Sequence, residues 1–139
     1  MAVFNRFNIF SEDLAEKVHD LNADTLRVYL SNTAPDAAAD AVKADLAEIS
    51  TGNGYTGAVD VQNATSRSGL VTSVTGVDVV VTATGAVGPF RYVVLYNDTP
   101  TSPADPLIAW WDYGSSITLN DGETLTIDFD GTNGVLQIA

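Results

Sequence analysis

The chain contains one histidine, His19, and no cysteine, so few side chains are available for nucleophilic catalysis. A Ser-His-Asp arrangement needs a histidine beside the nucleophile, and no serine lies in the G-x-S-x-G motif that places a nucleophile on a sharp turn. We expect His19 on the surface of a short solvated helix. Without cysteine there are no disulfides, no thiolate chemistry and no cysteine-based metal sites. These residues predict a protein that is not an enzyme and uses no cofactor.

Asp112 is the carboxylate whose neighbours most resemble those of a catalytic acid. It follows Trp110 and Trp111, and glycosidases use two carboxylates in a cleft. Alternation along a strand instead predicts that one tryptophan fills the core while its neighbour points outward. We favour this structural interpretation, so no catalytic residue is assigned.

Asp128 and Asp130 lie on the same side of an expected strand end, and oxygen ligands at alternating positions are typical of Ca²⁺ sites. Gly131 follows Asp130 directly, however, so the D-x-[DN]-x-[DN]-G spacing of a calcium loop is missing. We therefore predict an Asx-type turn here and no metal site in the chain.

The charge balance excludes several kinds of partner. Six basic residues face eighteen acidic ones, which gives a net charge of −12 and disfavours both nucleic acids and anionic membranes. The acidity keeps the protein soluble, and it also suits a basic partner surface. No apolar run approaches the ~20 residues of a membrane helix, and the first residues lack the layout of a secretion signal. We expect the protein to be made and folded in a cytoplasm.

The last fifty residues predict a strand meander. Apolar and β-branched residues alternate in short segments that are separated by Asn, Asp and Gly, which are typical turn residues. The predicted fold is therefore mainly β, an antiparallel β-sandwich or barrel of about seven to nine strands, with one or two short N-terminal helices. The strands expected here span 90–96, 107–112, 116–119, 123–129 and 135–138.

The first part of the chain mixes helices and strands. A helix is predicted to begin at Ser11 and to end near Asn22, and an alanine-rich helix is predicted over 36–49. The glycine-rich segment 50–57 has no lysine after its glycines, so it is interpreted as a structural turn. Further strands are expected at 25–30, 59–61, 70–74 and 77–84. The predicted core is Leu26, Val28, Val79, Val81, Val93, Leu95, Ile108, Trp110, Leu125 and Ile127.

The domain organisation is predicted as an N-terminal arm, 1–10, and a single β-rich domain, 11–139. Phe4, Phe7 and Phe10 make the arm strongly apolar, so it packs either on the protein's own core or on a neighbouring subunit. Together with Trp111 and Tyr113, these phenylalanines are the predicted interface residues. As an alternative, Trp110, Trp111, Tyr113, Tyr92 and Tyr96 supply an aromatic platform for a glycan-binding adhesion module.

Several segments resemble small virion structural proteins of tailed bacteriophages. These are the FNxF start, the segments DTLRVYLSNTAP and GNGYTG, and the runs FRYVVLYND and PLIAWWDYGSSITLNDGETLTIDFD. The resemblance implies a non-enzymatic capsid decoration, or cement, protein on the capsid exterior of the virion. It implies the major capsid protein as partner, and head-lattice symmetry favours a homo-oligomer, a trimer above all. A tail or adaptor component of the virion is the alternative within this family.

Overall fold

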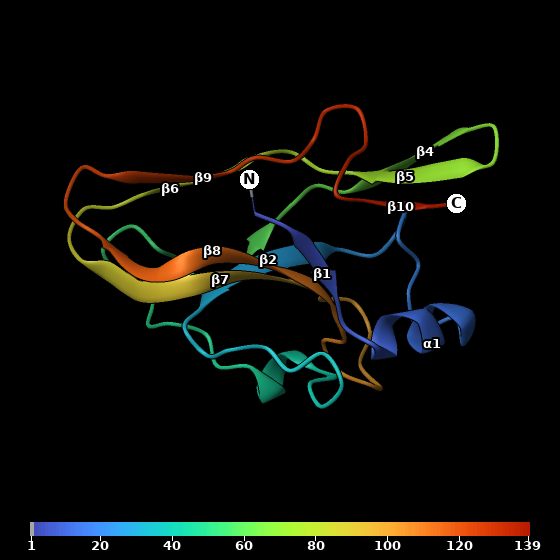
Figure 1. Cartoon of the computed structure of the whole chain (residues 1–139), viewed down its shortest axis with the longest axis horizontal. Coiled ribbons are helices and arrows are strands. Elements are labelled where there is room, and N and C mark those ends of the chain that lie inside the picture. The colour runs from blue at the N-terminus through green and yellow to red at the C-terminus, as the bar shows by residue number, and fades with distance from the viewer. Residues whose placement is uncertain (1) are drawn as a thin grey trace.

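The computed structural model describes residues 2–139 and shows a β-rich domain with one short α-helix (Figure 1). The helical elements in this range are α1 (Ile9–Ala15) and a 3-10 turn, η1 (Lys43–Asp45). The strands in this range are β1 (Phe4–Arg6), β2 (Leu26–Ser31), β3 (Val59–Asp60), β4 (Ala64–Ser68), β5 (Val71–Thr75), β6 (Val79–Thr82), β7 (Val87–Asn97), β8 (Leu107–Leu119), β9 (Thr124–Ile127) and β10 (Leu136–Ile138).

The strands form two layers (Figure 1). One layer is a five-stranded sheet with the order β1-β8-β7-β2-β3. The other contains a three-stranded sheet, β10-β5-β4, and a two-stranded sheet, β6-β9. Every strand pair is antiparallel, and the sheets remain open rather than closing on themselves. The prediction of a mainly β, antiparallel fold is confirmed.

The main core lies between the two layers. Val28 and Leu95 pair across β2 and β7, and both belong to a buried cluster that also contains Val74 and Val79 of the second layer. Leu30 belongs to a neighbouring cluster with residues of β6 and β7. Side chains alternate along a strand. The residues of β2 and β7 that lie between these core residues therefore point to the opposite face of the sheet, away from the second layer.

That opposite face is also buried. It carries Tyr29, Val94 and Tyr96, which form a second cluster with Leu46. The segment that follows β2 covers this face, and the Tyr29 hydroxyl donates to the Leu46 carbonyl at 2.9 Å. Because both faces of the sheet are buried, the sequence of β7 is a nearly continuous apolar run and does not strictly alternate between apolar and polar residues.

Most of the predicted core is buried. The fully buried members are Leu26, Val28, Val79, Val81, Leu95 and Ile108. The other four pack at the margins of the clusters and are half-buried: Val93, Trp110, Leu125 and Ile127.

Helix α1 is shorter than predicted, and it begins and ends earlier. Lys17 adopts a left-handed backbone, with φ 66°, directly after the helix. The N–H of Val18 donates to the Asp13 carbonyl and that of Lys17 to the Leu14 carbonyl, which is a Schellman motif. The chain therefore reverses before His19, and the prediction that helix continues to Asn22 is wrong.

The alanine-rich helix predicted over 36–49 is also wrong. Asp36 accepts hydrogen bonds from the N–H groups of Ala38 and Ala39, while Asp40 accepts one from the N–H of Asp36. Asp45 then accepts from Ala41 and Val42, which lie before η1. Carboxylate side chains thus satisfy backbone donors locally and close single turns, despite the helix propensity of alanine.

The segment predicted as an arm is continuous with the domain. β1 pairs with β8, with Phe4 opposite Trp111 and Arg6 opposite Ala109. The following residues begin α1. Residues 4–10 therefore supply an edge strand of the five-stranded sheet and the start of the helix (Figure 1).

Candidate functional site

The β1 edge of the five-stranded sheet carries the aromatic residues of greatest interest. The rings of Phe4 and Trp111 meet edge to face, with 5.7 Å between their centroids. Phe4 is 37% exposed and Tyr113 is 58% exposed, while Trp111 is half-buried against Phe129. Val3, directly before β1, is also exposed. We call Val3, Phe4, Trp111 and Tyr113 the edge surface.

Phe7 and Phe10, the other predicted interface residues, are buried within the chain itself. Phe7 has no exposed surface and packs against Trp110, with 4.6 Å between ring centroids. Phe10 belongs to the main core and contacts the His19 ring. Of the three N-terminal phenylalanines, only Phe4 therefore presents surface to a neighbouring molecule.

Beside the edge surface, Asp112 is held by Arg91. The guanidinium donates from Nε and Nη2 to the two carboxylate oxygens at 2.8 and 3.0 Å. The backbone N–H of Gly114 donates to Oδ1 as well. Arg91 and this N–H keep the pKa of Asp112 below its usual value. A charged, forked ion pair of this kind fixes the strand surface, and it is the opposite of the protonated state that a catalytic acid needs.

The aromatic residues proposed as a glycan platform are not brought together at the surface. Tyr92 and Tyr96 are buried on the outer face of the five-stranded sheet, beneath the segment that contains Leu46. Trp110 is half-buried beside Phe7. Within the described residues, Tyr113 alone of the five is classed as exposed.

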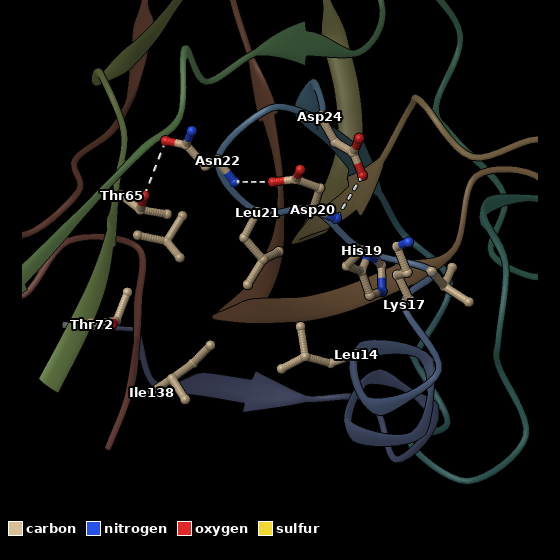
Figure 2. A pocket seen from close by; sticks show the side chains of 12 residues that line it. Leu14, Lys17, His19, Asp20, Leu21, Asn22, Asp24, Thr65, Thr72 and Ile138 are labelled. Carbon is tan, nitrogen blue, oxygen red and sulfur yellow. Dashed lines mark hydrogen bonds between the residues drawn. The ribbon is translucent and has the colours of Figure 1, made fainter. Parts of the chain in front are cut away.

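A groove of about 450 Å³ lies between the segment after α1, the β4–β5 hairpin and β10 (Figure 2). Its apolar floor and walls come from Leu14, Val18, Leu21, Val74 and Ile138. Three charged residues, Lys17, Asp20 and Asp24, lie along it. We call this the helix groove. A smaller groove of about 380 Å³ shares Leu14 and Ile138 with it and extends to Phe4.

His19 lines the helix groove and is buried, so the prediction that it lies on the surface is wrong. Its Nδ1 is 3.1 Å from the side-chain nitrogen of Asn97, which also donates to Asp24 at 2.7 Å. Nδ1 therefore accepts, which leaves the proton of a neutral ring on Nε2. Nε2 is buried and has no hydrogen-bond partner within residues 2–139. Burial lowers the pKa of His19 to about 4, although the nearby Asp24 carboxylate acts in the opposite direction.

The turn beside His19 explains the positions of these groups. Asp20 accepts from the N–H groups of Asn22 and Ala23, and Asp24 accepts from the N–H of Asp20 (Figure 2). Asn97 is completely buried at the end of β7. This cluster was not predicted from the sequence. The signal available in the sequence was the pair of aspartates four residues apart, a spacing that recurs in the Asp36–Asp40 turn.

Asp130 makes the Asx-type turn that its spacing predicted. Its Oδ1 accepts from the N–H groups of Thr132 and Asn133 at 2.7 and 2.8 Å. Over residues 2–139, no group of three or more His, Asp or Glu side chains has the arrangement of a metal site. The same range contains no helix with the length and apolar character of a membrane span.

Comparisons of the chain with protein-family models, with curated proteins and with solved structures found no match.

Proposed function

We propose that this protein is a non-enzymatic structural component of a tailed-bacteriophage virion, which decorates the capsid exterior and stabilises it by contacts with the major capsid protein. The observation that carries the proposal is the edge surface. It joins two aromatic residues with exposed area, Phe4 and Tyr113, to a tryptophan that is anchored in the core. Aromatic residues supported in this way are the typical centres of protein interfaces.

The scaffold supports the same proposal. β8 carries Trp111 and Tyr113 and pairs with β7 on both sides of an irregular segment. Trp111 pairs directly with Val93, and Tyr113 follows the last paired residue before that segment, Asp112. The Arg91–Asp112 ion pair fixes the neighbouring strand surface. Binding to a preformed surface loses little conformational entropy, because few side chains must be ordered on association.

The charge favours a basic partner surface. The net charge of −12 repels other acidic molecules and attracts a basic lattice at long range. Cyclic symmetry is common among homo-oligomers, and in this proposal a homotrimer at a threefold position of the lattice is the expected assembly.

A binding experiment with purified heads tests the proposal. Heads of the phage that encodes the chain, prepared without it, are mixed with the protein and sedimented. The proposal predicts saturable co-sedimentation, and it predicts that Phe4→Asp together with Tyr113→Asp abolishes it. Val80→Asp is the matched control, because Val80 is an exposed apolar residue on β6, in another sheet. If the protein does not sediment with heads but does sediment with tails or binds a glycan array, the capsid assignment is wrong.

A further inference from the structure

The β4–β5 hairpin ends in a leucine that is almost completely exposed. The strands are joined by Gly69 and Leu70, since Ser68 pairs with Val71. Gly69 has φ 61°, as the first central residue of a type II′ turn requires. Leu70 takes the second central position, which any small polar residue satisfies, and 95% of it is exposed. An apolar side chain kept in water at a turn is typical of a contact with another molecule.

The hairpin is locally basic, although the chain as a whole is acidic. Residues 61–77 contain no aspartate or glutamate, and they include Arg67. The Arg67 guanidinium donates to the Gly69 carbonyl, and it makes no ion pair within the described residues. In a protein of net charge −12, a hairpin without carboxylates approaches another copy with less repulsion than the acid-bearing segments do.

The helix groove has the complementary properties. Leu14, Val18, Leu21 and Ile138 give it an apolar lining, and Asp20 and Asp24 outnumber Lys17 along it. Leu70 matches the lining and Arg67 matches the excess of carboxylates. Thr65 and Thr72 of the hairpin's own stem form one wall of the groove (Figure 2), and the lining residues do not include the tip, Arg67 to Leu70. The contact must therefore join two molecules.

We infer that the tip of the β4–β5 hairpin, Arg67 to Leu70, docks in the helix groove of a second copy of this chain. The two surfaces are different parts of the molecule, so the contact is head to tail and leads to a closed ring when the rotation between copies permits. The inference rests on the homo-oligomer of the proposed function and identifies the surfaces that form it. The edge surface remains available for the capsid.

Sedimentation velocity of the full chain at high micromolar concentration tests this contact. The wild type is expected to form a closed oligomer. Leu70→Glu and Ile138→Glu, which alter the tip and the groove, are each expected to weaken association at least about tenfold and to give monomers. Val80→Glu, a matched exposed apolar position on β6, is expected to assemble as the wild type does. Arg67→Glu is expected to weaken assembly more at low salt than at high salt.

Mixing the two monomeric variants gives the sharpest result. Leu70→Glu retains an intact groove and Ile138→Glu an intact tip, so an equimolar mixture is expected to form a heterodimer and nothing larger. Circular dichroism checks that each variant is folded; if Ile138→Glu is not, Thr72→Glu on the groove wall replaces it. A monomeric wild type, a Leu70→Glu protein that assembles normally, or a mixture that stays monomeric overturns the inference. A monomeric wild type that still decorates heads overturns this contact and the preformed trimer, and leaves the capsid assignment standing.

Discussion

Phe4 and Trp111 face each other across β1 and β8, with their rings 5.7 Å apart and inclined at 69°. Trp111 is anchored on the inner side by the core, and Phe4 covers part of it from the edge. The pair therefore joins the interior of the sandwich to its surface. Because Phe4 itself remains more than one-third exposed, its contribution to folding and its contribution to binding can be separated by mutation.

Phe7→Ala is expected to reduce the stability of the fold. Phe4→Ala is expected to reduce binding and to leave the fold nearly intact. Phe7 is completely buried against Trp110, so its truncation is expected to lower the free energy of unfolding by about 3–5 kcal/mol. Phe4→Ala is expected to cost about 1 kcal/mol or less, since much of the ring is already in water. Urea unfolding curves measure both values. Equal losses of stability in the two variants would show that the edge surface is part of the core.

The pKa of His19 predicts a loss of stability as the pH falls. The folded protein holds this pKa at about 4, below the usual histidine value of 6.5, so between these values the unfolded chain binds more protons. Stability is then present above pH 6.5 and decreases down to about pH 4, by roughly 2–3 kcal/mol. Unfolding curves measured across this range, compared with those of His19→Gln, isolate the contribution. Asp13, whose pKa is raised by burial, acts in the opposite direction in both proteins and cancels in the comparison.

Asn97 should be essential to the same cluster. Its side-chain nitrogen donates to Asp24, and its Oδ1 accepts from the N–H of Thr99 at 3.1 Å. Asn97→Ala removes the donor to the buried Nδ1 of His19 and one of the two donors to Asp24, and it is expected to cost about 2 kcal/mol or more. Thermal unfolding above pH 7, where His19 is neutral, measures this effect alone. An unchanged melting temperature would contradict the hydrogen-bond network described here.

Two glycines of the 50–57 turn form a matched pair. Both have positive φ, but a Cβ on Gly54 meets the backbone carbonyl of Thr82, whereas a Cβ on Gly52 meets nothing within 4 Å. Gly52→Ala is therefore expected to cost about 1 kcal/mol from backbone strain. Gly54→Ala must also displace β6, and a loss of roughly 3 kcal/mol or more is expected. Chemical unfolding measures the free energy of unfolding of each variant. Similar losses in the two variants would contradict the close contact between Gly54 and Thr82 of β6.

Strands were predictable from the sequence where apolar periodicity was strong. The strand expected at 25–30 is β2, and the two expected at 107–112 and 116–119 are one continuous strand, β8. The turn expected near Gly114 is an irregular segment within β8. Pairing with β7 shifts register between Asp112 and Ile117, Gly114 has φ 103°, and the pairing resumes at Ile117 and Leu119. β1 was missed, since a three-residue edge strand has too few positions to show a period and its partner lies more than one hundred residues away.

The candidate site was predictable in part. Trp111 and Tyr113 follow from the aromatic run of β8, but the burial of Phe7 and Phe10 depends on tertiary packing that composition does not reveal. The position of His19 was missed because Lys17 reverses the chain in a left-handed conformation, which is uncommon for residues other than glycine. The helix predicted over 36–49 does not form for a similar, local reason. Backbone N–H groups donate to the carboxylates of Asp36 and Asp45, and these hydrogen bonds prevail over helix propensity.

The measurement that tests the central claim most directly is the stoichiometry of the protein on purified heads, determined by quantitative co-sedimentation of the wild type and of the Phe4→Asp, Tyr113→Asp double variant. The account predicts saturation by the wild type at a fixed ratio to the major capsid protein, with no binding by the folded double variant. Binding of the double variant at the wild-type ratio, or no binding by either protein, would contradict it.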